Sequence, residues 1–132
     1  MIHRLFSSDR QFKTLRFRPG LNLLLADKAP TAKSTDTRNG AEKTSAIELV
    51  HFIFGGTWER SDDPVIVEDF FGIEIDLGGQ RLTVRRSGSQ PGRVFFSEPI
   101  DSTQWPLQPE RVADGLSLRI DEWNALLGHF CF

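Results

Sequence analysis

Two alternating segments joined by a pair of glycines constrain the fold more than any other feature of this chain. Apolar and polar residues alternate from Phe71 to Leu77 and again from Gln80 to Arg86, with Gly78-Gly79 between them. Such alternation is typical of half-buried strands, and a two-residue glycine turn is typical of a β-hairpin. The run Val94–Phe96 follows a turn-rich stretch and supplies a third strand. The sequence therefore predicts an antiparallel hairpin or small meander.

The first part of the chain predicts two more strands and a long loop. Phe12 to Phe17 alternates roughly as a half-exposed strand does, and Pro19-Gly20 follows as a turn. Leu21 to Ala26 is a compact apolar run, which is typical of a strand buried on both faces. Asp27 to Asn39 is polar and rich in turn-forming residues, so we expect a loop there.

Two helices are also predicted. The first begins just after Gly40 and ends at Gly55-Gly56, because its apolar residues recur at spacings of three and four. The second is short and is capped by Asp121. The apolar residues of the first helix are Ala46, Ile47, Val50, Ile53 and Phe54. Those that we expect the second helix to bury are Trp123, Leu126, Leu127 and Phe130.

Composition indicates an ordinary globular domain of the cytoplasm. The 132 residues fit one modest domain that can bury a core, and 39% of them are hydrophobic and 26% charged. A formal net charge of -2 gives no overall sign of a nucleic-acid-binding protein. A single cysteine, Cys131, excludes an internal disulfide. No apolar run approaches the roughly 20 residues of a membrane span, so we expect no membrane partner.

The end of the chain points to a longer protein. The sequence stops at LLGHFCF, which is apolar and has no polar tail. We therefore interpret residues 1–132 as part of a larger chain. Exposure of Leu126, Leu127 and Phe130 at such an end would favour self-association, and hence a homodimer.

The stretch TRNGAEKTS, from Thr37 to Ser45, matches a phosphate-binding loop except at two positions. The consensus is GxxxxGK[ST], so Lys43-Thr44 takes the final pair, and Thr37 and Glu42 stand where glycines are expected. A buried strand, a loop, a lysine, a hydroxyl residue and a helix occur in the required order. The alternative interpretation is a simple turn at Asn39-Gly40 followed by a helix start, with Glu42 as a favourable first-turn acid.

A resemblance supports the first interpretation. From Phe17 to Gly56 the elements FRPGLNLLL, KSTDTRNG, AEKTS and IELVHFIFGG follow one another. This order resembles the N-terminal head segment of SMC/Rad50-like ABC ATPases, most closely the bacterial group called DUF2326, which is related to components of phage-defence systems. The downstream hairpin also resembles the antiparallel β-subdomain of these heads. The likeness covers about a third of the chain.

The resemblance implies a fold, a cofactor and partners. The fold would be α/β, the N-terminal lobe of a P-loop NTPase (an ABC ATPase head) over residues 1–132, with a mixed sheet and an antiparallel β-subdomain. ATP and Mg²⁺ would be the cofactors, and a second ATPase head or a C-terminal lobe would be the partner. The full-length protein would act on DNA, in repair or in phage defence.

The resemblance also implies roles for the loop residues. Asn39 and Gly40 would form the turn over the phosphates, Lys43 would be the Walker A lysine, and Thr44 would bind magnesium. Ser45 would contact the α-phosphate. The full cofactor-binding set is Asn39, Gly40, Ala41, Glu42, Lys43, Thr44 and Ser45.

Glu42 departs from the family pattern at the most sensitive position. Glycine there lets the backbone approach the phosphates, whereas glutamate adds a side chain and a like charge. A carboxylate about 4 Å from one phosphate charge costs roughly 1 kcal/mol in water and about 4 kcal/mol at an effective dielectric of 20. Glu42 is an engineered knockout, a natural loss of nucleotide binding, or a variant that points away, and we expect impaired binding.

The parts needed for hydrolysis are not evident in the sequence. VIVEDFF, from Val65 to Phe71, offers apolar residues before Glu68-Asp69, but the run is short and the acids stand in the opposite order to a Walker B motif. We interpret it as a solvated acidic turn. No signature-like loop follows, so no catalytic residue is assigned and no hydrolysis is expected from this chain alone.

Other candidate residues carry weaker hypotheses. His3, His51 and His129 have no metal-ligand spacing. Arginines on or beside the hairpin, namely Arg81, Arg85 and Arg86, would touch DNA as in related heads or form a solvated strand face. The alternative function is a nucleotide-free interaction module that docks a partner through its hairpin and C-terminal helix.

Overall fold

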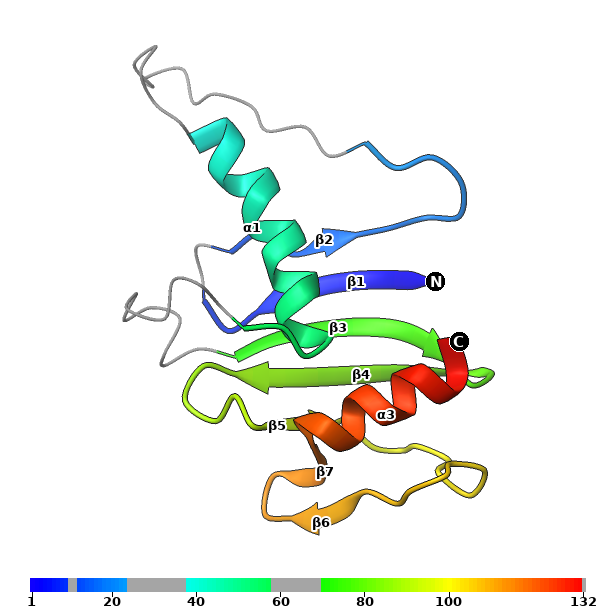
Figure 1. Ribbon diagram of the computed structural model, residues 1–132. Helices are drawn as coiled ribbons and strands as arrows, with labels where there is room; N and C mark the ends of the chain where they lie inside the picture. Colours follow the sequence, from blue (N-terminus) through cyan, green and yellow to red (C-terminus); the bar gives the residue numbers. More distant parts are fainter. Residues whose placement is uncertain (10–11, 24–37, 58–69, 132) are drawn as a thin grey trace.

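The computed structural model describes residues 1–9, 12–23, 38–57 and 70–131, and along the first helix it describes side chains from Ala46 onward. Strands and helices alternate irregularly along the chain (Figure 1). The elements are β1 (Ile2–Ser7), β2 (Leu15–Arg16), α1 (Arg38–Ile53), β3 (Phe70–Leu77), β4 (Gln80–Ser87), β5 (Arg93–Phe96), β6 (Glu110–Val112), β7 (Gly115–Arg119) and α3 (Ile120–Cys131).

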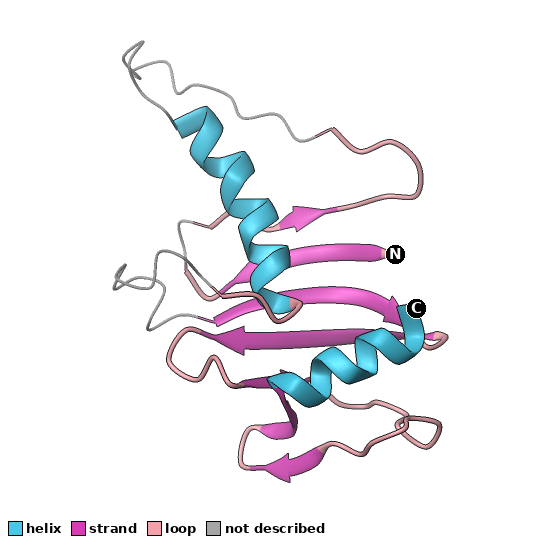
Figure 2. Cartoon of the chain, viewed as in Figure 1, coloured by secondary structure: helices cyan, strands magenta, loops and turns pink. Residues whose placement is uncertain are grey.

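The strands form one seven-stranded sheet in the order β2-β1-β3-β4-β5-β7-β6. Each pair of neighbouring strands is antiparallel. The chain is thus a small α/β domain, and the mixed sheet expected from the resemblance is wrong for the residues described. The long hairpin β3–β4 forms the centre of the sheet (Figure 2).

The hairpin prediction is confirmed. β3 and β4 pair from Phe70↔Ser87 to Leu77↔Gln80, and Gly78 and Gly79 form the turn with φ of 58° and 80°. Two successive positive φ angles define the turn type whose twist matches that of the flanking strands, and glycine adopts them without a steric cost. β5 then pairs with β4, as the run Val94–Phe96 predicts.

Two predictions for the first part of the chain need correction. The expected strand Phe12–Phe17 is reduced to Leu15–Arg16, and β1, which no pattern predicted, pairs with it. The expected buried strand Leu21–Ala26 is wrong for Leu21–Leu23, which are exposed and not in a strand. Residues 24–26 lie outside the described residues. An apolar run specifies burial only when the fold supplies a covering surface, and no such surface covers these leucines.

Both helices pack on the same face of the sheet (Figure 1). Trp123 of α3 donates its indole N–H to the carbonyl oxygen of Ile53 in α1 at 2.8 Å, which ties the helices together across the core. The core contains alternate residues of the central strands and the inner faces of both helices: Leu5, Leu49, Phe52, Ile53, Phe71, Ile73, Ile75, Leu77, Leu82, Val84, Val94, Phe96, Trp105, Leu118, Trp123 and Leu126. The intervening strand residues therefore point to the opposite face, which no described helix covers.

The α1 boundaries differ from the prediction at one end only. The helix begins at Arg38, so Asn39 and Gly40 belong to its first turn and the turn expected at these two residues is wrong. At the other end, Gly56 N–H donates to the His51 carbonyl at 2.8 Å, and Gly55 N–H donates to that of Phe52 at 3.1 Å. This pair of bonds is a Schellman motif, and it confirms the predicted stop.

The second predicted helix is confirmed as α3, with a different cap. The Glu122 carboxylate accepts a hydrogen bond from the backbone N–H of Arg119 at 3.0 Å, so Arg119 occupies the cap position and Asp121 lies in the first turn. Leu126 is fully buried, and Leu127 and Phe130 are half-buried against the core. The predicted burial of this face is therefore confirmed for Trp123 and Leu126, and the expectation of an exposed apolar C-terminal helix is wrong.

Candidate functional site

The C-terminal half of α1 is firmly anchored in the core. Leu49, Phe52 and Ile53 are buried, and Ala46 is the first described side chain of the helix to face inward. The N-terminal half extends past the edge of the sheet beyond β2 (Figure 1). The helix therefore presents its first turns, which carry the predicted nucleotide-binding residues, away from the core.

Arg86 secures the anchored end of α1. Its guanidinium donates hydrogen bonds to the carbonyl oxygens of Phe52 and Gly56, and to that of Pro91 at 2.7 Å from Nε. It also lies over the Phe52 ring, 4.2 Å from the ring centre. Burial lowers the pKa of Arg86, but arginine remains protonated in proteins. The positive charge therefore faces the negative end of the helix dipole, and the hypothesis that Arg86 touches DNA is wrong because the side chain is buried.

All seven predicted cofactor-binding residues lie in the first half of α1. Their side chains are outside the description, and so is Thr37. In a helix that begins at Arg38, the backbone N–H groups of Lys43 and Thr44 are within the i→i−4 hydrogen-bond ladder. The free N–H groups belong to the first turn, around Arg38 to Gly40. A helix in this register does not offer the amide of Lys43 to a phosphate.

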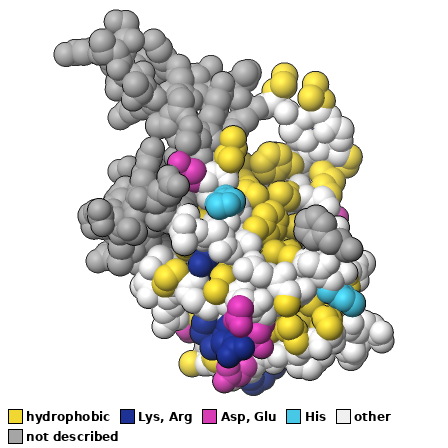
Figure 3. Space-filling view, viewed as in Figure 1, with side chains coloured by type: hydrophobic (Ala, Val, Ile, Leu, Met, Phe, Trp, Pro, Cys, Tyr) yellow, Lys and Arg dark blue, Asp and Glu magenta, His cyan; other side chains and the backbone are white. Residues whose placement is uncertain are grey.

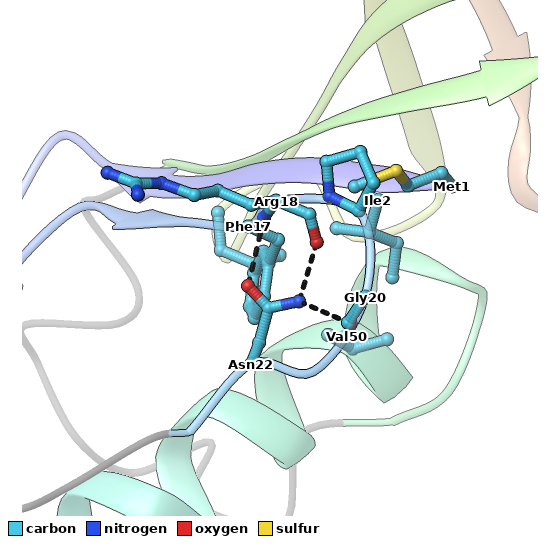
Figure 4. A pocket seen from close by; sticks show the side chains of 9 residues that line it. Met1, Ile2, Phe17, Arg18, Gly20, Asn22 and Val50 are labelled. Carbon is cyan, nitrogen blue, oxygen red and sulfur yellow. Dashed lines mark hydrogen bonds between the residues drawn. The ribbon is translucent and has the colours of Figure 1, made fainter.

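A hollow of about 260 Å³ opens between α1, the start of β1 and the segment after β2 (Figure 4). Its walls are mainly apolar. They include Met1, Ile2, Phe17, Pro19 and Val50. The Arg18 guanidinium points away from the hollow in this view, so the side chains that enter it carry no charge.

Asn22 shapes one wall of the hollow. Its side-chain oxygen accepts from Arg18 N–H at 2.9 Å, and its side-chain nitrogen donates to the carbonyl oxygens of Arg18 at 2.7 Å and Gly20 at 3.1 Å. These bonds close the chain into a compact turn that presents the neighbouring leucines outward. Leu21 and Leu23 are 88% and 75% exposed.

The exposed large hydrophobic residues of the described chain either line this hollow or lie close in sequence to residues that line it. Leu21 and Leu23 flank Asn22, Met1 lines the hollow, and Ile47 lies one turn before Val50 on α1 with 72% of its surface exposed. Figure 3 shows the hydrophobic side chains concentrated beside α1 on the helix-covered face. Sequence patterns missed the hollow, although the apolar run at Leu21 was its signal.

The other sequence candidates are dispersed. Arg81 forms ion pairs with Glu74 and Asp76, and Arg85 lies on the sheet face opposite the helices. The acidic pair Glu68-Asp69 lies outside the described residues. Within the described ranges, no group of three or more His, Cys, Asp or Glu side chains is arranged to hold a metal ion. Also within those ranges, no helix has the length and apolar character to cross a membrane.

Comparison with known proteins returns no match: no protein family, no curated protein and no solved structure is similar to this chain.

Proposed function

We propose that this chain is the ATP- and Mg²⁺-binding lobe of an SMC/Rad50-like ATPase, with its Walker A loop impaired by Glu42. The observation that carries the proposal is the order of motifs in the sequence: FRPGLNLLL, a polar loop, Lys43-Thr44 and an amphipathic helix. The projection of the N-terminal half of α1 supports it, because a helix start clear of the core is open to an anion. The antiparallel sheet corresponds to the β-subdomain of such a head.

Nucleotide binding at Lys43 requires α1 to shorten. Phosphate-binding loops hold the anion with backbone N–H groups that are free of helical hydrogen bonds. In α1 the amides of Lys43 and Thr44 are engaged, so the turn from Arg38 to Glu42 unwinds when ATP binds. Glu42 opposes binding through its charge, and a glycine in its place would both remove the charge and weaken the helical turn by about 1 kcal/mol.

The hollow supports the second half of the proposal, a partner lobe or second head. Leu21, Leu23 and Ile47 leave apolar surface in water beside the helix that would carry the nucleotide. Large apolar side chains exposed near one another are typical of an interaction site. In the proposed assembly the partner covers the hollow and supplies the residues for hydrolysis, so the isolated chain binds ATP weakly and does not hydrolyse it.

Titration calorimetry with Mg-ATP on the natural sequence and on Glu42→Gly tests the proposal. We expect the glycine variant to bind at least about tenfold more tightly, because a like charge about 4 Å from phosphate costs several times RT in a partly buried site. Circular dichroism on the same samples should show a loss of helical signal when ATP is added.

Two controls make the result specific. Glu48→Gly weakens the same helix without touching the loop, and it should leave ATP affinity unchanged. Adding Lys43→Ala to Glu42→Gly should abolish the gain. Equal ATP affinities for the natural chain and Glu42→Gly would contradict a Walker A loop switched off by Glu42.

A second candidate is a nucleotide-free interaction module. The exposed residues around the hollow favour it, and they place the docking surface there instead of on the hairpin and C-terminal helix. Absence of ATP binding by both the natural chain and Glu42→Gly would favour this module over the ATP-binding lobe, whereas docking of a partner at the hollow is expected of both.

A further inference from the structure

The sheet face opposite the helices carries a distinct set of side chains. Strand alternation points Phe71, Ile73 and Leu82 into the core, so their neighbours along β3 and β4 point to the other side. Across β2, β1, β3, β4, β5 and β6, this open face presents Arg16, Arg4, Phe6, Phe70, Glu74, Asp76, Arg81, Arg85, Arg93, Phe95 and Glu110.

The unpaired charges on the open face are positive. Glu74 pairs with Arg4 at 3.1 Å and Glu110 with Arg93 at 2.7 Å. Asp76 accepts a hydrogen bond from His3 at 2.7 Å, which lowers the pKa of Asp76 and keeps it charged.

Arg85 and Arg16 form no ion pair with any residue that the structure describes. At the far end, Arg119 forms ion pairs with Asp121 and Glu122 of α3. Among the described residues, the charges left unpaired on the open face are therefore positive, although the whole chain has a net charge of -2.

Arg85 occupies the centre of this face with an unused donor. Its Nε is buried and has no hydrogen-bond partner among the described residues. Phe95 on β5 stands directly opposite Arg85, and Gly72 does so on β3. The buried Nε itself is out of reach of a ligand, but Arg85 as a whole is partly exposed, so its positive charge can attract an anion at the surface.

Aromatic rings flank Arg85 on both sides. Phe70 lies 5.6 Å from the Arg85 guanidinium and contacts Phe6 edge-on at 6.3 Å. The Arg4 guanidinium lies over Phe6 at 4.3 Å. Phe95 is partly exposed, and its ring contacts no other ring in the described part of the chain. A partly exposed aromatic residue with no ring partner therefore stands opposite a cation that forms no ion pair within the described chain.

We propose that this open face binds single-stranded nucleic acid, with Phe95 stacking on a base and Arg85 contacting the adjoining phosphate. Neighbouring strands are about 4.8 Å apart, so Phe95 and Arg85 lie within the reach of one nucleotide. An uncovered sheet with aromatic and basic side chains recognises unpaired bases, because a base inside a duplex cannot stack on a protein ring. The inference is independent of ATP binding, since α1 lies on the other face.

Fluorescence anisotropy with labelled oligo(dT) and oligo(rU), each of about 12 nucleotides, tests this inference at low salt without ATP. We expect the natural chain to bind, with Phe95→Leu weakening affinity at least about fivefold, the lower end of the range for loss of one stacked base. Arg85→Ala should weaken affinity to a similar degree and reduce the salt dependence. Arg111→Ala removes an exposed arginine of β6 that points to the opposite side, and it should bind like the natural chain.

Several outcomes would overturn the inference. These are no binding by the natural chain, an equal loss for Arg111→Ala and Arg85→Ala, tighter binding to a duplex, or equal binding to an acidic polyglutamate peptide. A second measurement does not depend on the variants. Photo-crosslinking of a thiouridine-labelled oligo(rU) to the natural chain should label the peptide containing Phe95, and labelling confined to other segments would contradict the proposed face.

Discussion

At the scale of single residues, Arg86 has a structural role that its place in the sequence conceals. It lies in an alternating, arginine-rich strand, where a solvated or DNA-facing position is the natural expectation. In the structure its side chain points into the core, and no carboxylate of the described residues pairs with it. Instead, the Arg86 guanidinium donates hydrogen bonds to backbone carbonyl oxygens and lies over the ring of Phe52. The residue thus joins β4 to the end of α1.

We expect Arg86→Met to destabilise the domain by roughly 2–4 kcal/mol, because buried carbonyl oxygens lose donors that cannot be replaced by water. Urea denaturation measures the loss. Arg81→Met is the matched control, since Arg81 is exposed and its ion pairs contribute at most about 1 kcal/mol. An Arg86→Met midpoint equal to that of the control would refute the role assigned to Arg86.

At the scale of elements, the two ends of α1 differ. The C-terminal end is held by the Schellman motif and Arg86 and packs against α3, whereas the N-terminal end projects from the sheet. Gly55 makes the tight end possible: its φ is 106°, and a Cβ at this position would collide with Asn124 of α3. The contact between the two helices therefore depends on the absence of a side chain at Gly55.

Gly55→Ala should lower the free energy of unfolding by about 1–3 kcal/mol, since the backbone conformation is strained for alanine and the helix contact must open. Gly128→Ala serves as a comparison within α3, where an added Cβ meets no neighbouring atom. It should leave stability unchanged or raise it by up to about 1 kcal/mol. Thermal unfolding of both variants provides the measurement, and a harmless Gly55→Ala would show that the helix end tolerates a side chain.

At the scale of the whole molecule, the sheet has one packed face and one open face, and the packed face is incomplete. Both helices cover the centre and the β7 side, while the hollow beside α1 remains lined by apolar residues. The side chains of Leu21, Leu23 and Ile47 contribute little to the stability of the isolated chain, because they are already exposed to water. Burial of these side chains would provide a favourable free energy only when another protein surface covers them.

Replacing Leu21 and Leu23 together by serine should reduce concentration-dependent self-association without a loss of stability. Moving a leucine side chain from water into an apolar interface is favourable by roughly 1.5–3 kcal/mol. We therefore expect the natural chain to associate through the hollow. Sedimentation velocity over a concentration series follows the association, and urea denaturation checks stability. A natural chain that stays monomeric throughout the series, or a double variant that unfolds more easily, would contradict an exposed docking surface.

Local chemistry was enough to predict much of the fold. Alternation predicted β3, β4 and β5, the glycine pair predicted their turn, and helical spacing predicted both helices and the stop at Gly55-Gly56. These features depend on contacts between residues near in sequence or on a turn geometry that glycine favours. The phosphate-loop interpretation of Lys43 and Thr44 stays a prediction, because the side chains that would settle it lie outside the description.

By itself, the sequence determined the central hairpin, the two helices and the apolar character of the run at Leu21. Only the tertiary structure decided that β1 joins the sheet, that Arg86 is buried while Arg85 is not paired, and that Leu21 and Leu23 face solvent. The physical reason is that burial and charge pairing depend on which distant segments meet. An arginine in such a strand is buried in the core, as Arg86 is, or remains a surface cation, as Arg85 does. The strand register decides which face of the sheet it occupies.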